Sequence, residues 1–517
     1  MEHDQVSSDD SRDPIAIHAA TEPDRLACVD LATDARLTYG QFDAWIDRCA
    51  AWLEGRLVAP RGERVAVLAR NGVDVLAIQF ACGRIGAIFV PLNWRLPGPE
   101  LAVLVEDAAP RLLIHEREFD AALPALDRFG LDRVVRDETF AAQLTAAPAR
   151  PTRTEPVAPD DPAILLYTSG TTGKPKGVMI SPRNAWTSAA NYAAAAKVGP
   201  EVVFLCDTPL FHTVGLIAIS RTTLQVGGVL LMSPIFDPAL TVRRLADPAL
   251  GITHYFCVPQ MAQMLRETPH YADADLSRLT ALCTGGAPIA PAVIHRWLDE
   301  GVMIIDGYGM SEAGTVLGMP VGDLSTPRAK AGSAGVPAPG VRVRLVDRDG
   351  RDVPEGEVGE IWLKGANITS GYWNQPMATA NAFEDGWLKT GDAARRDADG
   401  FYFLVDRWKD MFISGGENVY PAEIEAAILE MDAVSEVAVI GVPDPRWGEA
   451  GVAYVTPKSG MDLTPEAVLA HCRTRIAGYK TPRQVVLTAD GLPRTGSGKV
   501  RKDILRAWWR ATTSPTS

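Results

Sequence analysis

A short segment of the chain gathers the residue types that hold phosphate groups. Residues 167–178 read Tyr-Thr-Ser-Gly-Thr-Thr-Gly-Lys-Pro-Lys-Gly-Val, with three glycines, two lysines and four serine or threonine hydroxyls. Glycines let the backbone turn its N–H groups toward an anion, and hydroxyls and lysines complete a cradle for phosphate oxygens. The segment therefore predicts a phosphate-binding loop.

Two other interpretations of this segment fit less well. The P-loop of kinases and ATPases has Gly-Lys followed by Ser or Thr and then a helix, whereas Gly173-Lys174 is followed here by Pro175. A flexible surface linker would share the composition, but it would not be expected to share the whole order of residues.

The segment resembles the signature of the acyl-adenylate-forming, or AMP-binding, superfamily. This superfamily includes fatty-acid-type acyl-CoA synthetases, aryl-CoA and 4-coumarate-CoA ligases, firefly luciferase and the adenylation domains of peptide synthetases. Segments that resemble its other motifs follow in the same order, so the resemblance extends from about residue 20 to 505. They are Pro209–Leu216, Thr284–Pro288, Asp306–Glu312, Lys389–Asp392, Asp406–Asp410, Ser414–Pro421 and Pro493–Lys502.

The resemblance implies a nucleotide site made from several of these segments. Tyr308 would stack on adenine, since an aromatic face loses little rotamer entropy. Asp392 would accept the two ribose hydroxyls, Arg407 would bind ribose or phosphate, and the glycines after Ser414 would approach the pantetheine of CoA. The residues implied to bind ATP or CoA are Thr168, Ser169, Gly170, Thr171, Thr172, Gly173, Lys174, Gly286, Ala287, Pro288, Asp306, Gly307, Tyr308, Gly309, Met310, Ser311, Asp392, Arg407, Gly415 and Gly416.

Three of the implied residues would handle charge during the reaction. Thr168 and Glu312 would hold Mg²⁺, which takes hard oxygen ligands together with substrate phosphates. Lys499, in a glycine-flanked loop, resembles the family's catalytic lysine. Attack of a carboxylate on the α-phosphate builds negative charge, and a cation about 4 Å away is worth roughly 4 kcal/mol at an effective dielectric of 20.

An acyl pocket is implied beside a histidine. His212, Val214, Ala218 and Gly285 match the pocket positions of similar ligases, and most are small or apolar. Such a lining suits a medium-chain fatty acid or an aryl or cinnamic acid. A malonate-type substrate would need a buried cation. Arg221 is the nearby candidate, although a structural or solvent-facing role is expected for it.

The activity implied by the resemblance is that of an acid–thiol ligase that uses ATP, Mg²⁺ and coenzyme A. The acid and ATP would give an acyl-adenylate and pyrophosphate. Rotation of a small domain about Lys409 would then withdraw Lys499 and admit the CoA thiol. Other functions stay open on the sequence: an acyl-AMP ligase that loads a carrier protein, a luciferase-like oxygenase, or a non-catalytic nucleotide sensor.

The elements expected around these motifs alternate between strands and helices before residue 400, which predicts βαβ units and layered α/β architecture. The clearest are the strands 64–68, 89–92 and 163–167 and the helix 73–87. Afterwards the pattern changes to helices over 421–431 and 465–476 and a strand over 434–442. We expect a large multi-subdomain α/β N-terminal domain over residues 1–405 and a small mobile α+β C-terminal domain over 406–517.

The composition argues against some partners. The 517 residues carry a net charge of -13, which does not favour nucleic acid, because phosphate backbones need a basic face. The seven cysteines are scattered and the N-terminus is polar, as in a reduced protein without a signal peptide. No apolar run reaches the roughly 18 residues that span a membrane. A cytoplasmic protein is expected, and enzymes of the resembled family are often homodimers.

Overall fold

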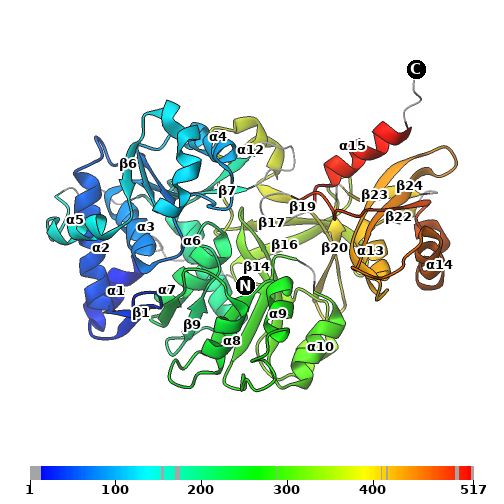
Figure 1. The fold of residues 1–517 in the computed structure, drawn as a ribbon, viewed down its shortest axis with the longest axis horizontal. Helices are drawn as coiled ribbons and strands as arrows, with labels where there is room; N and C mark the ends of the chain where they lie inside the picture. The colour runs from blue at the N-terminus through cyan, green and yellow to red at the C-terminus, as the bar shows by residue number, and fades with distance from the viewer. Residues whose placement is uncertain are drawn as a thin grey trace. The chain divides into compact units, whose positions relative to one another are not determined.

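The computed structural model of the chain describes residues 13–152, 157–168, 175–287, 289–408, 410–414, 417–494 and 500–513. These residues fall into two compact units (Figure 1). Unit 1 comprises Met1–Val343, Leu363–Leu388 and Asp399–Tyr402, and unit 2 comprises Arg344–Trp362, Lys389–Ala398 and Phe403–Ser517. The functional division at residue 406 stays a prediction.

A six-stranded sheet in unit 1 contains the strands on either side of the predicted phosphate loop. Its strands are β3 (Arg64–Leu68), β4 (Ile88–Pro91), β5 (Leu112–His115), β6 (Asp132–Val135), β7 (Ile164–Thr168) and β8 (Lys176–Ile180). They run in the order β6-β5-β3-β4-β7-β8. All neighbours are parallel except β7 and β8. The three strands expected in this region are confirmed to within about one residue.

A nine-stranded sheet forms the second layer of unit 1, in the order β15-β14-β13-β12-β11-β9-β10-β1-β2. Its strands are β1 (Leu26–Asp30), β2 (Ala35–Thr38), β9 (Val203–Cys206), β10 (Val229–Met232), β11 (His254–Cys257), β12 (Ala281–Gly285), β13 (Ile304–Met310), β14 (Gly314–Gly318) and β15 (Val336–Pro337). The central strands are parallel, as the βαβ prediction requires. The expected α/β class is therefore confirmed.

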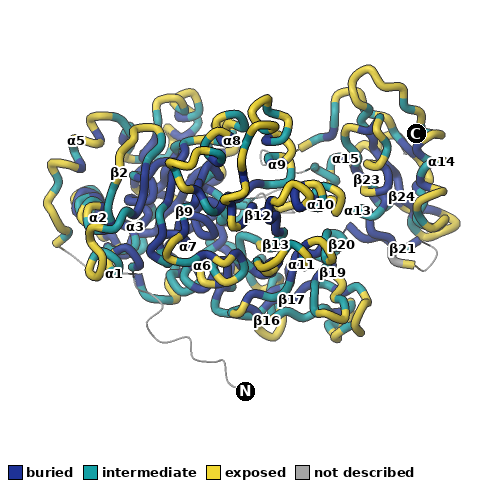
Figure 2. The backbone as a smooth tube through the Cα atoms, turned by 90° about the horizontal axis from the view of Figure 1, so that it is seen from below, coloured by how far each residue is buried: buried dark blue, intermediate teal, exposed yellow. Residues whose placement is uncertain are grey.

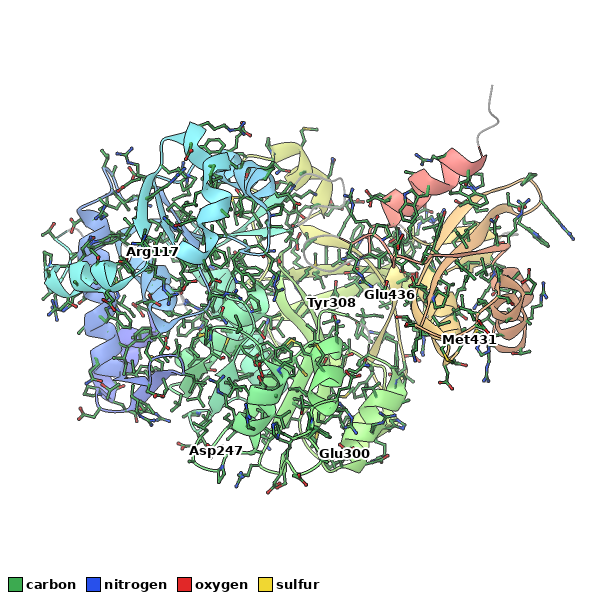
Figure 3. All side chains as sticks on the ribbon, viewed as in Figure 1. Arg117, Asp247, Glu300, Tyr308, Met431 and Glu436 are labelled. Carbon is green, nitrogen blue, oxygen red and sulfur yellow. The ribbon has the colours of Figure 1, made fainter. Side chains whose placement is uncertain are left out.

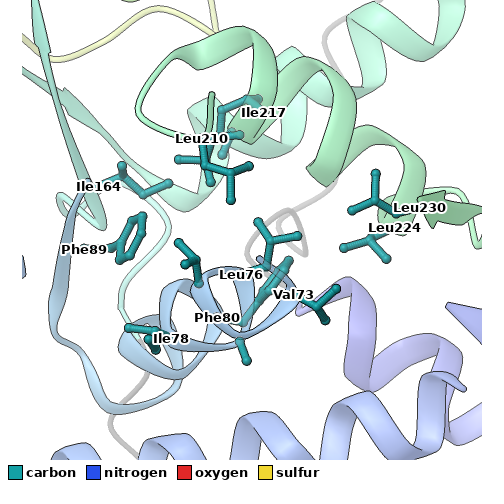
Figure 4. Close-up of a cluster of buried hydrophobic side chains, with 14 of the residues drawn as sticks. Val73, Leu76, Ile78, Phe80, Phe89, Ile164, Leu210, Ile217, Leu224 and Leu230 are labelled. Carbon is teal, nitrogen blue, oxygen red and sulfur yellow. The ribbon is translucent and has the colours of Figure 1, made fainter. Parts of the chain in front are cut away.

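Helix α3 (Val73–Ile85) packs against strands of both sheets, β4 and β1. Residues on every side of this helix are buried, which explains why its sequence is apolar all round. Figure 4 shows Leu76 and Phe80 among apolar side chains of the same cluster, such as Leu210. The helix ends two residues before its predicted end, since Gly86 adopts a left-handed φ of 79°.

The remaining helices of unit 1 cover the two sheets. They are α1 (Pro14–Thr21), α2 (Tyr39–Glu54), α4 (Gly98–Ala108), η1 (Arg117–Phe129, 3₁₀), α5 (Glu138–Ala146), α6 (Pro182–Ala196), η2 (Val214–Arg221, a π-helix), α7 (Thr222–Gln225), α8 (Pro238–Ala246), α9 (Pro259–Arg266), α10 (Pro291–Asp299), α11 (Ser325–Ala329) and α12 (Pro376–Ala382). Figure 2 shows the contrast between the buried β9 and the largely exposed α5.

Two further sheets complete the fold. One has the order β16-β17-β19-β18, with β20 paired to β19; its strands are β16 (Val341–Val346), β17 (Val358–Gly365), β18 (Phe383–Glu384), β19 (Trp387–Arg396) and β20 (Tyr402–Arg407). The other has the order β22-β21-β24-β23, with β25 paired to β24; its strands are β21 (Phe412–Ser414), β22 (Glu417–Val419), β23 (Val434–Asp444), β24 (Gly448–Pro457) and β25 (Gln484–Leu487).

Helices α13 (Pro421–Leu429) and α14 (Pro465–Arg475) pack on this last sheet through an apolar cluster that includes Phe412 and Ile424. Short helix η3 (Gly478–Lys480) and α15 (Lys502–Thr513) follow. The helices and the strand expected after residue 400 are thus confirmed, with small shifts at their ends. Among the described residues, no helix is both long and apolar enough to cross a membrane.

A buried carboxyl group lies at the end of β9. Asp207 is 2% exposed, and its carboxylate accepts hydrogen bonds from the hydroxyls of Thr241 at 2.9 Å and Tyr255 at 3.0 Å. Burial outweighs these two hydrogen bonds and raises the pKa of Asp207 to about 7. In the unfolded chain the same group would lose its proton near its ordinary pKa, so folding holds a proton there.

Replacing Asp207 with asparagine should remove a pH-dependent loss of stability. The stability due to the raised pKa is complete below the unfolded pKa and disappears as the pH rises through the folded pKa of about 7. Asp207→Asn should therefore gain roughly 2 kcal/mol over the wild type between about pH 5 and pH 8, in unfolding followed at several pH values. Asp299→Asn, at an exposed carboxylate, is the control. Equal pH dependence of Asp207→Asn and the wild type would contradict the prediction.

Candidate active site

The predicted phosphate loop connects two adjacent, antiparallel strands of the six-stranded sheet. β7 ends at Thr168 and β8 begins at Lys176, and these two residues are register partners. Because β7 runs parallel to β4, the loop starts at the carboxyl edge of the sheet, where open α/β sheets bind ligands. Six residues predicted for this loop lie outside the described residues: Ser169, Gly170, Thr171, Thr172, Gly173 and Lys174.

Glu312 lies between β13 and β14, and a tyrosine holds its carboxylate. The Tyr372 hydroxyl donates to Glu312 Oε1 at 3.0 Å, and the Thr369 N–H donates to the Glu312 carbonyl oxygen at 2.8 Å. The Lys176 Nζ lies 4.5 Å from the centre of the Tyr372 ring. The structure thus brings the end of the phosphate loop and the predicted metal-binding carboxylate to the same side chain.

The side-chain oxygen atoms of Thr168 and Glu312 are suitable ligands for magnesium. Both residues are partly buried, and a hydroxyl with a single carboxylate fits an ion that keeps waters and takes its other ligands from substrate phosphates. Within the described ranges, no group of three or more His, Cys, Asp or Glu side chains could hold a metal ion. A metal that arrives with nucleotide phosphates therefore fits these residues.

The predicted adenine loop follows a close approach of β12 and β13. Gly285 and Gly307 are register partners, and a Cβ on Gly285 would lie 2.9 Å from the Gly307 carbonyl oxygen. A Cβ on Gly309 would lie 2.3 Å from the carbonyl oxygen of Gly314. Both glycines are required by the neighbouring backbone. Gly285, predicted to line the acyl pocket, therefore also has a structural reason for its identity.

Tyr308 is partly buried on β13 (Figure 3), and its hydroxyl donates to the Met310 sulfur at 3.8 Å. Gly286 and Ala287 are exposed just after β12, and Gly286 has a left-handed φ of 80°. Ser311 lies beside Glu312 in the lining of a small cavity. Pro288, the remaining residue of this predicted loop, lies outside the described residues.

Among the residues of the predicted adenine loop, Asp306 has a protonation state that is changed by folding. Its carboxylate accepts the Gly307 N–H at 2.9 Å, but burial raises the pKa of Asp306 to about 8. The group therefore keeps its proton through neutral pH, and a neutral carboxyl can both donate and accept, as an amide can.

The predicted ribose-binding pair lies in unit 2. Arg407 Nη1 lies 2.9 Å from Asp392 Oδ1, and the Asp392 side chain is 14% exposed. The Thr390 hydroxyl accepts the Asp392 N–H at 3.0 Å. Lys409, Gly415, Gly416 and Lys499 lie outside the described residues. Arg494 and Val500, the described residues on either side of 495–499, form an antiparallel bridge.

The histidine motif leads into a π-helix. His212 is partly buried against the Phe211 ring, with ring centres 4.5 Å apart, and Val214 and Ala218 lie on η2. The hydroxyls of Ser220 and Thr222 donate to the carbonyl oxygens of Gly215 and Ile217, at 2.7 and 3.2 Å. π-Helical turns occur often at functional sites, and these hydroxyls stabilise this one.

Arg221, at the end of η2, is buried rather than solvent-facing. Its guanidinium carbon lies 5.9 Å from the Phe80 ring centre, and its Nε has no partner among the described residues. Burial lowers the pKa of Arg221 to about 10, against the opposing effect of Asp13. Packing against a ring of the apolar core agrees with the structural role expected for this residue.

An arginine–aromatic cluster in unit 1 was not predicted. The guanidinium carbons of Arg70 and Arg95 lie 4.1 and 4.8 Å from the Trp94 ring centre, and Phe211 packs edge-on against Trp94 at 5.9 Å. Arg70 also forms two hydrogen bonds of 2.9 Å to Glu118. In the sequence, the adjacent Trp94 and Arg95 were the only indication of this cluster. It could not be recognised from them alone, because it also depends on the contact with the distant Phe211.

Comparison with known proteins identifies the family. The model of the AMP-binding enzyme family matches residues 15–373, and the model of its C-terminal domain matches residues 423–499. The chain is 42% identical to a feruloyl-CoA synthase of Amycolatopsis sp, covering 91% of this chain and 93% of the relative. It is 37% identical to an indoleacetate–CoA ligase of Aromatoleum aromaticum, covering 95% and 96%.

A solved structure agrees with these sequence relationships. ATP-bound MatB from Rhodopseudomonas palustris superposes with a TM-score of 0.87 at 30% identity, covering 97% of this chain and 99% of that one. The chain belongs to the AMP-binding enzyme family and is an acid–thiol ligase, which uses ATP, Mg²⁺ and CoA to convert a carboxylic acid to an acyl-CoA through an acyl-adenylate.

Proposed function

We propose that this ligase activates an aryl-substituted carboxylic acid, of the arylpropenoic or arylacetic kind. The observation that carries this proposal is the similarity to a feruloyl-CoA synthase, at 42% identity over 91% of the chain, and to an indoleacetate–CoA ligase, at 37% identity over 95%. The histidine motif adds support, since Phe211 places an aromatic wall next to His212 and η2 offers small apolar residues at Val214 and Ala218. A flat ring is a good fit to such a lining.

Two other acids are less well supported. A long-chain-fatty-acid–CoA ligase of Mycobacterium tuberculosis is 34% identical to the chain, so an alkyl acid is the second candidate. A malonate-type substrate would need a cation for its second carboxylate, and the buried Arg221 is packed against Phe80 instead. Of the two predicted classes of substrate, medium-chain fatty acids and aryl acids, we therefore propose the aryl acids.

Each of the site residues would have a separate role in the reaction. When bound, Mg²⁺ would neutralise charge on the phosphates of ATP. Thr168 and Glu312 would hold that ion, Tyr308 would stack on adenine, and Asp392 would orient the ribose. Lys499 would stabilise the charge that develops as the substrate carboxylate displaces pyrophosphate. The substrates react directly with each other, so the enzyme supplies position and electrostatics.

The proposed substrate class can be tested by pyrophosphate release from Mg·ATP, with and without CoA. Ferulate, indoleacetate, benzoate, octanoate, palmitate and malonate would be compared at matched concentrations. Ferulate or indoleacetate should give a kcat/KM at least about tenfold above octanoate, since a pocket shaped for a ring loses contacts with a flexible chain. A preference for octanoate or palmitate would support the alkyl candidate instead. Pyrophosphate exchange without thioester formation would point to a carrier-protein acceptor.

The Arg70–Trp94–Arg95 cluster is our candidate for the nucleotide end of CoA. Burial and the positive charge of Arg70 lower the pKa of Arg95, which means that an anion placed there would relieve repulsion. Arg95 has no ion pair within the ranges described, whereas Arg70 is paired with Glu118. A phosphate offers the negative charge that this cluster lacks, and an attached aromatic base offers a flat surface that could stack on its ring or its guanidinium groups.

Arg95→Ala should raise the KM for CoA by about tenfold, because it removes a charged hydrogen-bond donor to phosphate. The adenylation half-reaction, measured as pyrophosphate–ATP exchange without CoA, should stay at the wild-type rate. Arg128→Ala is the matched control, since Arg128 also lies over a ring, that of Phe129 at 4.7 Å, and pairs with Glu106. An unchanged KM for CoA in Arg95→Ala would rule out this assignment.

Asp392→Ala should raise the KM for ATP by about tenfold or more, because a carboxylate that accepts the ribose hydroxyls is lost. The KM for the carboxylic acid should change little. Asp352→Ala provides the control in the same unit, since Asp352 also pairs with an arginine, Arg344 at 2.7 Å. If both variants affect the KM for ATP equally, Asp392 has no special part in ribose binding.

We also infer a cytoplasmic location. All seven cysteines are buried and unpaired, as expected in a compartment that keeps thiols reduced. The homodimer suggested by the family resemblance stays a prediction.

A further inference from the structure

Residues 369–373 form a turn in unit 1 that is joined to the strand after the phosphate loop. The Met179 N–H donates to the Gly371 carbonyl oxygen at 3.1 Å, and the Trp373 N–H donates to that of Gly177 at 2.8 Å. Val178 and Tyr372 form an antiparallel bridge between these contacts. The turn therefore moves with β8, whose first residue is the register partner of Thr168.

The same turn is joined to Glu312 at two points. One is the backbone hydrogen bond from Thr369, and the other is the hydrogen bond from the Tyr372 hydroxyl to the carboxylate. No other side chain in the described part of the chain donates to that carboxylate.

The shape of the turn is fixed from its other side. Gly371 has a φ of 140°, and a Cβ there would lie 2.3 Å from Thr379 Cγ2. The Thr379 hydroxyl, on α12, accepts the Tyr372 N–H at 2.9 Å. Only glycine tolerates both this φ angle and the close approach of Thr379. The backbone conformation at Gly371 therefore fixes the position of Tyr372 relative to β8.

A cavity of about 10 Å³, lined by both polar and apolar side chains, lies beside Glu312, with room for about one water molecule. Asn367 also lines it and is 2% exposed, and its Oδ1 atom has no partner among the described residues. A carboxylate that lines a cavity can shift unless a neighbouring group holds it. Among the described side chains, the Tyr372 hydroxyl is the group that does so.

We propose that Tyr372 is a positioning residue, which orients the Glu312 carboxylate for the metal·ATP complex and ties its position to the phosphate loop through β8. This inference rests on the proposed role of Glu312 as a magnesium ligand. Holding one oxygen of the carboxylate leaves the other available to the metal. Residues that orient a metal ligand in this way typically change metal affinity about 10–100-fold when they are removed.

The test is Mn²⁺ binding to the whole enzyme in the presence of α,β-methylene-ATP, followed by electron paramagnetic resonance. Tyr372→Phe should weaken Mn²⁺ binding about tenfold while thermal unfolding stays near that of the wild type. Tyr271→Phe is the matched control, because the Tyr271 hydroxyl also donates to a glutamate, Glu300. Glu300 lies well apart from Tyr308 of the predicted adenine loop (Figure 3). The Mn²⁺ affinity of this control should equal that of the wild type.

Two further variants, Glu312→Gln and the double variant with both Glu312→Gln and Tyr372→Phe, distinguish the positioning role of Tyr372 from the magnesium-ligand role of Glu312. We expect Glu312→Gln to weaken Mn²⁺ binding, and Tyr372→Phe to add nothing in that background, since the tyrosine acts through the carboxylate. Weakening by Glu312→Gln with wild-type affinity in Tyr372→Phe would overturn the positioning role and leave the proposed function intact. Additive effects would also overturn it, because they indicate a general structural role. Wild-type affinity in Glu312→Gln would remove the magnesium-ligand role itself.

Discussion

The antiparallel pairing of β7 with β8 fixes the distance between the two ends of the phosphate loop. Its backbone hydrogen bonds are formed by largely buried strands, where water cannot replace them, so the pair is costly to open. The groups of unit 1 that handle charge are placed relative to this pair. The 369–373 turn is bonded to β8, and Glu312 is bonded to the turn. A rigid frame of this kind suits a reaction in which the enzyme contributes position.

Burial sets the charge states of several groups around this frame. Asp306 and Asp207 both have raised pKa values because their carboxyl groups are removed from water. Arg221 is a cation in an apolar setting, and its pKa is lowered for the same reason. The fold therefore offers the nucleotide loop a neutral carboxyl at Asp306. The two carboxylates proposed for function are each held in place, Glu312 by the Tyr372 hydroxyl and Asp392 by Arg407.

Much of the fold was predictable from periodicity and glycine placement. Apolar runs such as 64–68 are too short and too β-branched for helices, and the alternation with helical patterns fixed the α/β class. The motif order also predicted a nucleotide loop at residues 306–312 and binding roles for Asp392 and Arg407, but not the ion pair between them. These features depend on residues that are close in sequence or belong to an ordered set of motifs.

Other features depend on contacts between distant residues, which no local pattern carries. Tyr372 meets Glu312 across sixty positions, and Trp94 meets Phe211 only because the fold brings their loops together. The hydrogen bonds of the π-helix after His212 differ by one residue from those of an α-helix, and local sequence patterns do not carry that difference. The reason for Gly285 likewise became visible only with the neighbouring strand in place.

The π-helix has a consequence for redesign of the substrate range. One wall of the proposed acyl pocket keeps its wide turn through hydroxyl groups on Ser220 and Thr222, which bond to carbonyl oxygens of the same helix. Those side chains are buried and can be kept while the residues at 214 and 218 are varied. A library that exchanges pocket residues but preserves the hydroxyls would retain the backbone of the wall. One that randomises the whole segment would tighten it toward an ordinary helix and rotate both of its pocket residues, Val214 and Ala218, at once.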